Sequence, residues 1–140
     1  MSKVAIVYWS GTGNTEQMAN AVAEGAKGKG AEVTMCGPSE FDTSSLDNYD
    51  AIAFGCPAMG AEVLEESEFE PMFTSVEALL GGKKVGLFGS YGWGDGQWMR
   101  DWQDRVTNAG GVLVQDGVMA NNAPDDAALQ ACKELGEALA

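Results

Sequence analysis

The sequence predicts a three-layer α/β domain, in which helices cover both faces of a parallel β-sheet. Short apolar runs alternate with segments of helical periodicity along the 140 residues. The runs are continuously apolar rather than alternating with polar residues, as expected for strands that are buried on both faces. A chain of this length can bury one hydrophobic core, so we expect a single domain over residues 1–140.

Five apolar runs are the candidate strands. In chain order they are KVAIVYW (3–9), EVTMC (32–36), DAIAFGC (50–56), KKVGLFG (83–89) and GVLVQDGVM (111–119). All of them are far shorter than a membrane-spanning segment. The first run also lacks the charged region and the cleavage site of a secretory signal, so we expect a cytoplasmic protein.

Four segments have the periodicity of amphipathic helices. They cover residues 14–27, 70–80, 96–108 and 124–140. Trp98, Trp102 and Val106 recur at helical spacing, which predicts that they face the core. Asp125 places a negative charge at a helix start, where the helix dipole favours it. The acidic and polar segment 38–48 is compatible with a short helix or with none.

Composition excludes several classes of function. Histidine is absent, which excludes imidazole catalysis and imidazole metal ligands. The three cysteines lie far apart without C-x-x-C spacing, so neither a disulfide framework nor a zinc site is indicated. The formal net charge of -13 argues against nucleic acid or an anionic membrane as a partner. A partner with a basic face fits this charge.

The stretch YWSGTGNTE, residues 8–16, joins the first candidate strand to the first candidate helix. Such a loop presents unpaired amide N–H groups at the positive end of the helix dipole, where anions bind. Side-chain donors come from Ser10, Thr12, Asn14 and Thr15, and Gly11 and Gly13 permit close backbone approach. The lysine of a nucleoside-triphosphate loop is missing, as is the third glycine of a dinucleotide loop. We therefore expect a phosphate monoester held by uncharged donors; a plain turn is the alternative.

Two further loops are expected at the same edge of the sheet. Ligands of doubly wound sheets bind beyond the carboxyl ends of the strands, where loops 57–66 and 90–96 should join the first loop. Met59, Tyr91 and Trp93 in these loops suggest stacking against a planar ring. The alternative is that Met59 and Trp93 fold back to cap the core.

The segments VYWSGTGNTE, GCPAMG, EVLEESEFEP, GLFGSYGWGDG and WMRDW together resemble the short-chain flavodoxins, most closely those of clostridial and related anaerobic type. The resemblance extends from the first strand to the last helix. It implies a flavodoxin-like three-layer sandwich with a five-stranded parallel sheet of order 2-1-3-4-5 and helices on both faces. It also implies one noncovalently bound FMN and low-potential electron transfer, one electron at a time, without substrate turnover by the protein itself.

The resemblance further implies how the cofactor is held. The phosphate would lie on Ser10, Thr12, Gly13, Asn14 and Thr15. Met59 and Trp93 would pack on the two faces of the isoalloxazine ring. Glu62 would accept a hydrogen bond from the ring N3–H, and the Gly60 carbonyl would meet the N5–H of the reduced flavin. The remaining predicted contacts come from Trp9, Gly11, Pro57, Ala58, Ala61, Ser90, Tyr91, Gly92, Gly94 and, at the ribityl chain, Asn122.

Two positions depart from the pattern of this family. Pro57 stands where some relatives carry a serine, so the hydroxyl contact of that serine is lost here. Ala61 stands where some carry Asp, Ser or Gly, and its Cβ is expected to change how readily the adjacent peptide turns.

Acidic residues crowd the segment that follows the third candidate strand. They are Glu62, Glu65, Glu66, Glu68 and Glu70. One carboxylate about 10 Å from the flavin, at an effective dielectric constant near 40, opposes an added electron by roughly 0.8 kcal/mol, or about 35 mV. Several such charges would lower the reduction potential by about 0.1 V before salt screening. The alternative is a solvated helix face.

The expected partners are redox proteins with basic faces, such as flavodoxin or ferredoxin reductases, oxidoreductases or hydrogenases. The resemblance implies a monomeric carrier. A flavodoxin-like FMN-dependent NAD(P)H oxidoreductase is the enzymatic alternative, but such relatives usually need additional loops and oligomers for a substrate pocket. A receiver or phosphatase domain of similar topology is disfavoured because its motifs are missing.

Overall fold

The computed structural model describes residues 2–11, 13–59, 63–92 and 94–140. Its centre is one parallel sheet of β1 (Lys3–Tyr8), β2 (Glu32–Cys36), β3 (Ala51–Gly55), β4 (Lys84–Tyr91), β5 (Val112–Leu113) and β6 (Val118–Asn121). The order is β2-β1-β3-β4-β5, with β6 also paired to β4. The predicted order of strands is therefore confirmed.

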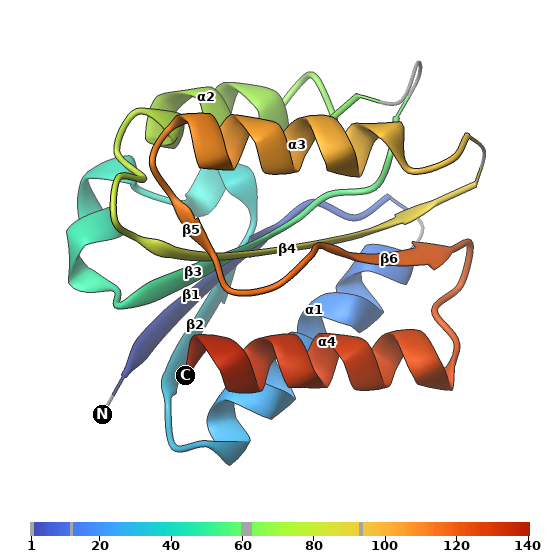
Figure 1. Cartoon of the computed structure of the whole chain (residues 1–140), viewed down its shortest axis with the longest axis horizontal. Coiled ribbons are helices and arrows are strands. Elements are labelled where there is room, and N and C mark those ends of the chain that lie inside the picture. Colours follow the sequence, from blue (N-terminus) through green and yellow to red (C-terminus); the bar gives the residue numbers. More distant parts are fainter. Residues whose placement is uncertain (1, 12, 60–62, 93) are drawn as a thin grey trace.

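Helices cover both faces of the sheet, as predicted (Figure 1). They are α1 (Asn14–Gly28), α2 (Phe69–Glu77), α3 (Gln97–Asn108) and α4 (Asp126–Leu139). The helices α1 and α4 lie on one face, and α2 and α3 lie on the other. Asp125 caps α4 by accepting a hydrogen bond of 2.8 Å from the Ala128 amide. The segment whose structure the sequence left open contains two short 3-10 helices, Pro38–Glu40 and Thr43–Asn48.

Aromatic side chains fill the core between the sheet and α2 and α3. Trp98 and Trp102 are 1% exposed, which confirms the packing role predicted for them. Trp102 meets the ring of Phe69 edge to face, with centroids 5.5 Å apart. Phe54 of β3 and Phe73 make the same kind of contact at 5.1 Å. Such pairs stabilise a core beyond the area that they bury.

The opposite core includes many alanines, and two glycines let α1 and α4 pack at close range. A Cβ atom on Gly25 would lie 1.9 Å from the Lys133 carbonyl oxygen, and one on Gly136 would lie 2.0 Å from the carbonyl oxygen of Val22. The two glycines therefore face each other's helix reciprocally across one interface. Neither position has room for a side chain unless the helices separate.

The fifth predicted strand is divided, which corrects the single run of residues 111–119. Leu113 pairs with Val85 and Val118 pairs with Phe88, so the edge strand has two more residues than β4 between these points. The break is fixed from α3: the Gln103 carboxamide accepts a hydrogen bond of 2.6 Å from the Gly117 amide. The sulfur of Met99 also fills the space beside Gly117: a Cβ atom added to Gly117 would lie only 2.3 Å from it.

The fourth strand is longer than predicted and reaches the candidate site. Ser90 and Tyr91, expected in a loop, belong to the end of β4, where they pair with Ala120 and Asn121 of β6. This pairing anchors both residues at the edge where β1, β3 and β4 end together. None of the helices in the described part of the chain is long and apolar enough to cross a membrane.

Candidate functional site

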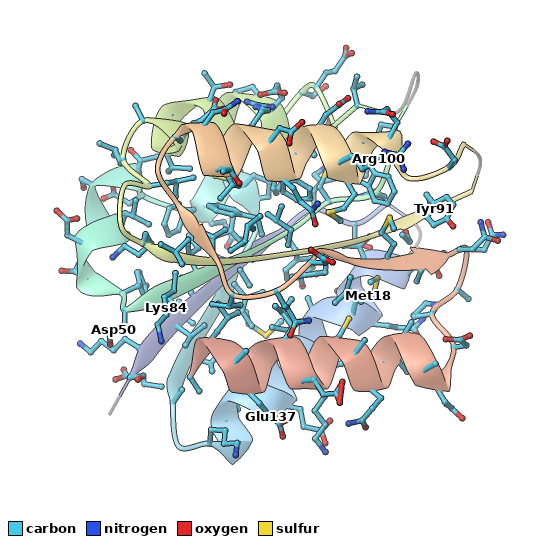
Figure 2. The ribbon with its side chains drawn as sticks, in the orientation of Figure 1. Met18, Asp50, Lys84, Tyr91, Arg100 and Glu137 are labelled. Carbon is cyan, nitrogen blue, oxygen red and sulfur yellow. The ribbon has the colours of Figure 1, made fainter. Side chains whose placement is uncertain are left out.

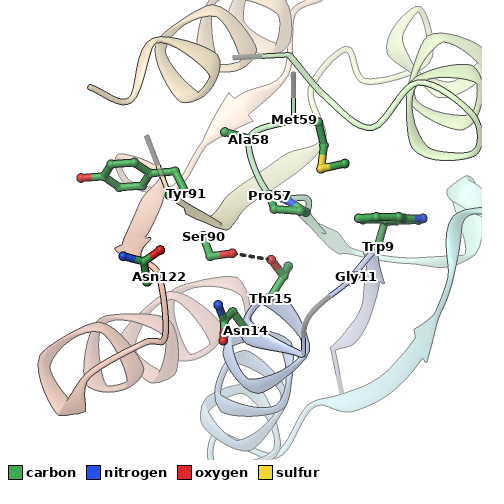
Figure 3. A pocket seen from close by; sticks show the side chains of 11 residues that line it. Trp9, Gly11, Asn14, Thr15, Pro57, Ala58, Met59, Ser90, Tyr91 and Asn122 are labelled. Atoms are coloured by element: carbon green, nitrogen blue, oxygen red, sulfur yellow. Dashed lines mark hydrogen bonds between the residues drawn. The ribbon is translucent and has the colours of Figure 1, made fainter. Parts of the chain in front are cut away.

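An open pocket of about 260 Å³ lies beyond the carboxyl ends of β1, β3 and β4, next to the start of α1 (Figure 3). It is lined by Trp9, Gly11, Asn14, Thr15, Pro57, Ala58, Met59, Ser90, Tyr91, Gly92 and Asn122. All of these residues were predicted from the sequence as one site, although they come from four separate segments. The lining residues that the structure describes carry no charged side chain.

The first loop ends in a helix start that presents amide donors. Gly13 precedes α1 with a positive φ of 93°, a conformation that suits glycine. The Ser10 hydroxyl oxygen accepts hydrogen bonds from the amides of Gly13 (3.1 Å) and Glu16 (3.3 Å). The amides of Asn14 and Thr15 begin the helix, where no earlier carbonyl is available inside it. Together with the helix dipole they give this end of α1 the amide donors that the sequence-based prediction of an anion site requires.

Hydrogen bonds join this loop to the neighbouring strands. The Thr15 and Ser90 hydroxyl oxygens lie 3.3 Å apart, and both residues are buried (Figure 3, dashed line). The Ala58 amide donates to the Ser90 carbonyl oxygen at 3.0 Å. The start of α1, the end of β4 and the loop after β3 are therefore connected through Ser90.

Apolar and aromatic groups form the walls of the pocket. In Figure 3, Trp9 and Met59 lie on one side of the opening, and Tyr91 and Asn122 lie on the other. The indole of Trp9 covers Gly11, where an added Cβ atom would be only 3.0 Å from the ring. Asn122 has a φ of 60°, and its amide donates to the Tyr91 carbonyl oxygen at 2.7 Å. The pocket therefore has apolar walls, with the neutral polar groups of Thr15 and Ser90 buried inside it and that of Asn122 at its rim.

Some predicted site residues are not among those that line the pocket. Ser10, Gly13 and Gly94 lie outside the lining, Ser10 and Gly13 because they shape the turn into α1. The predictions for Thr12, Gly60, Ala61, Glu62 and Trp93 fall outside the described residues. Met59 and Val63 exchange backbone hydrogen bonds of 2.8 and 2.9 Å.

Glu65 has a structural role that sequence reasoning missed. Its carboxylate accepts hydrogen bonds from the amides of Ser67 (2.9 Å), Glu68 (2.7 Å) and Phe69 (2.9 Å), and it therefore caps the start of α2. The residue is 7% exposed. Burial raises the pKa of this carboxyl, but the amide donors outweigh burial and the net pKa lies below its ordinary value.

The variant Glu65→Gln is expected to lose about 2 kcal/mol of unfolding free energy at pH 7, because a charged acceptor of three amides is lost. The folded-state pKa is lowered, so this stabilisation is present above the ordinary value of 4.5 and disappears as the pH falls through the folded-state pKa. The free energies of urea unfolding of the two proteins should therefore differ most near neutral pH, and the difference should shrink as the pH falls below 4.5.

Glu66→Gln is the matched control for this prediction, because Glu66 is exposed. Its unfolding free energy should stay within about 0.5 kcal/mol of the parent. Equal losses in both variants would contradict the capping role of Glu65.

Glu70 also differs from a free solvated carboxylate. The Arg105 guanidinium donates to both of its carboxylate oxygens at 2.8 Å and to both of those of Glu77 at 3.0 Å. The hydrogen bonds from Arg105 lower the pKa of Glu70. Since its charge is paired, Glu70 contributes less to the field at the pocket than the sequence suggested, and Glu66 and Glu68 remain as exposed charges of this segment.

Comparison with known proteins agrees with this geometry. Residues 6–136 match the family model of flavodoxin. The flavodoxin of Clostridium beijerinckii is 50% identical over 135 residues, which cover 96% of this chain and 97% of that protein. The flavodoxin of Megasphaera elsdenii is 49% identical, with 98% of each chain covered. The solution structure of the two-electron reduced Megasphaera elsdenii flavodoxin superposes with a TM-score of 0.89 over 97% of both chains.

The family model and the alignments with these relatives each cover nearly the whole chain. The parallel sheet of order 2-1-3-4-5 agrees with them. The chain therefore belongs to the flavodoxin family of FMN-bound electron carriers.

Proposed function

We propose that the pocket at the ends of β1, β3 and β4 is the FMN site, with the phosphate at the start of α1 and the ring between the two later loops. This assignment rests on one observation: the described residues that line the pocket are uncharged, and the lining includes the first two residues of α1. In this assignment the amides of Asn14 and Thr15 and the side chains of the first loop donate to the phosphate. The predicted contacts of Thr12, Gly60, Ala61, Glu62 and Trp93 belong to the same proposal.

The donor set suits a phosphate monoester on a neutral aromatic ring. A cluster of Lys or Arg would favour a more highly charged polyphosphate, whereas amides and hydroxyls hold a monoester without that charge. Trp9, Met59 and Tyr91 offer apolar area to a planar ring. Asn122 is held at the rim through its own amide, and in this assignment it would meet the ribityl chain.

FMN, when bound, supplies the one-electron and two-electron redox chemistry. The residues of the pocket bind and orient it. Trp9, Met59 and Tyr91 limit the access of water to the ring, which makes an added negative charge less well solvated. The net charge of -13 opposes the same charge, so both effects favour a low reduction potential.

The distribution of charge supports a partner that approaches the pocket with a basic face. Five of the eight Lys and Arg residues lie at the amino ends of the strands, away from the pocket: Lys3, Lys27, Lys29, Lys83 and Lys84. Figure 2 shows Lys84 at one end of the sheet and Tyr91, at the pocket, at the other. Few of the positive charges therefore lie at the pocket end, and with a net charge of -13 the protein attracts and orients cationic surfaces there at low salt. We infer a monomeric cytoplasmic carrier without its own substrate turnover.

Reconstitution tests this proposal. Apo-protein titrated with FMN should quench flavin fluorescence with a stoichiometry of one, and riboflavin, which lacks the phosphate, should bind at least about a hundredfold more weakly. A potentiometric titration should resolve two separate one-electron steps. The protein alone should not oxidise NADPH in the steady state. Equal affinity for riboflavin and FMN would overturn the phosphate site, and steady NADPH oxidation would favour the oxidoreductase alternative.

A further inference from the structure

Cys56 is a buried thiol that makes polar contacts at both ends of one pocket loop. It follows β3 directly and is 0% exposed. Its Sγ donates to the Pro57 carbonyl oxygen at 3.5 Å and accepts a hydrogen bond from the Glu65 amide at 3.3 Å. Burial raises the pKa of this thiol to about 12, so the sulfur keeps its proton at neutral pH. The sulfur therefore connects the first residue of the loop to the residue that ends it.

The other polar groups of Cys56 are held as well. Its amide donates to the Phe88 carbonyl oxygen at 3.1 Å, and its carbonyl oxygen accepts from the Trp98 indole N–H at 3.2 Å. Glu65, on the far side of the loop, is fixed to the start of α2 through its carboxylate. The Cys56–Glu65 contact thus joins two residues that are each anchored by further hydrogen bonds.

The loop closed in this way contributes directly to the pocket. Pro57, Ala58 and Met59 line it, and the Met59–Val63 bridge continues the loop toward Leu64, which is buried. Without the sulfur, the buried Glu65 amide would have no acceptor at this position, and a buried N–H without a partner is costly. The loop would shift to find one, and the side chains at 57–59 would move with it.

We propose that Cys56 is a positioning residue for FMN, whose thiol closes the 57–65 loop and so sets where Pro57, Ala58 and Met59 meet the ring. This inference rests on the proposed assignment of the pocket to FMN. Cys56 does not touch the cofactor in this role and takes no part in electron transfer. It acts through the geometry of the loop.

A pair of alanine variants tests this role. Cys132 is the matched control, because it is also a free cysteine with 0% exposure, but it lies in α4 away from the loop. Cys56→Ala should raise the dissociation constant of oxidised FMN about tenfold and speed amide hydrogen exchange at Glu65 about tenfold. Cys132→Ala should change both quantities by less than about twofold, even though both variants lose a similar buried volume.

Cys56→Ser provides the rescue, because a hydroxyl keeps one donor and one acceptor. Its Glu65 exchange rate and its FMN dissociation constant should return to within about threefold of the parent. A measurement on the parent apo-protein adds a test that needs no variant: the Glu65 amide should exchange at least about tenfold more slowly than that of exposed Glu66.

The proposal is overturned if Cys56→Ala leaves exchange and affinity unchanged, if Cys132→Ala has the same effects, or if the Glu65 amide of the parent is unprotected. A different pair of results would show that the FMN assignment itself is wrong. In that case Cys56→Ala would still speed amide hydrogen exchange at Glu65, but a negative charge introduced at the start of α1 would leave the FMN dissociation constant unchanged.

Discussion

Gly136→Ala is expected to lower the unfolding free energy of the apo-protein by about 3 kcal/mol, although alanine is the better helix former. The reason is the backbone of α1: a Cβ atom at residue 136 would lie 2.0 Å from the Val22 carbonyl oxygen and 2.8 Å from the Ala26 nitrogen. Main-chain atoms cannot rotate away as a side chain can, so α1 and α4 must separate. The midpoint of thermal unfolding, followed by circular dichroism, should fall by roughly 10 °C.

Gly28→Ala is the matched control in the same helix pair. Gly28 ends α1, and an added Cβ atom would meet nothing within 4 Å. This variant should be neutral or more stable by up to about 1 kcal/mol, because alanine loses less backbone entropy on folding. Destabilisation by Gly28→Ala equal to that by Gly136→Ala would show that helix propensity, and not the interface, controls the result.

The double variant Gly25→Ala/Gly136→Ala tests the reciprocal geometry. Gly25 approaches the Lys133 carbonyl oxygen as Gly136 approaches that of Val22. Once the helices have separated to admit one methyl group, the second has room at little further cost. The double variant should therefore lose less stability than the sum of the single ones, by about 1 kcal/mol or more. Strict additivity would contradict a shared interface.

The sequence predicted the strands, the helices and the pocket because each has a local signal. Glycine and hydroxyl residues after β1 mark a helix start, and Met59 after β3 and Tyr91 at the end of β4 stand out as large side chains among small residues. The parallel strands bring these signals to one edge of the sheet, and for this reason the sequence predicts the described residues that line the pocket. No local pattern specifies a contact between distant segments, so contacts of this kind could not be predicted from the sequence.

Three residues illustrate that limit. Five glutamates stand close together after β3, and composition cannot show that Glu65 turns inward to cap α2. Gly136 weakens a helix by propensity, and only the approach of α1 explains its presence there. Cys56 has the signature of a core residue, which it is, but the partner of its sulfur lies nine positions away across a loop. The split of the edge strand likewise depends on Gln103 of α3.

Asn14→Asp is expected to weaken FMN binding at least about a hundredfold while it leaves the apo-protein intact. The first turn of α1 accepts a negative charge, which stabilises the helix by about 0.3–1 kcal/mol. The same charge opposes the phosphate. Charges of one and two units about 5 Å apart, at an effective dielectric constant near 40, repel by roughly 3 kcal/mol. Stability and affinity should thus change in opposite directions, which loss of folding cannot imitate.

Asn20→Asp is the control for the charge alone, because Asn20 is exposed and lies on the same helix beyond the first turn. Its FMN dissociation constant should stay within about threefold of the parent. Fluorescence titration at several salt concentrations should show that salt partly restores binding in the Asn14 variant. An Asn14 variant that binds FMN as tightly as the parent would exclude the start of α1 as the phosphate site.

The pH dependence of the Asn14 variant identifies the repelled group. A phosphate monoester loses its second proton near pH 6, so its charge falls from two units toward one as the pH drops to 5. The new aspartate, with an ordinary pKa near 4, remains charged over this range. The ratio of the FMN dissociation constants of variant and parent should therefore fall by roughly tenfold between pH 7.5 and pH 5. With riboflavin as the ligand there is no phosphate to repel, and the difference between variant and parent should vanish at both pH values.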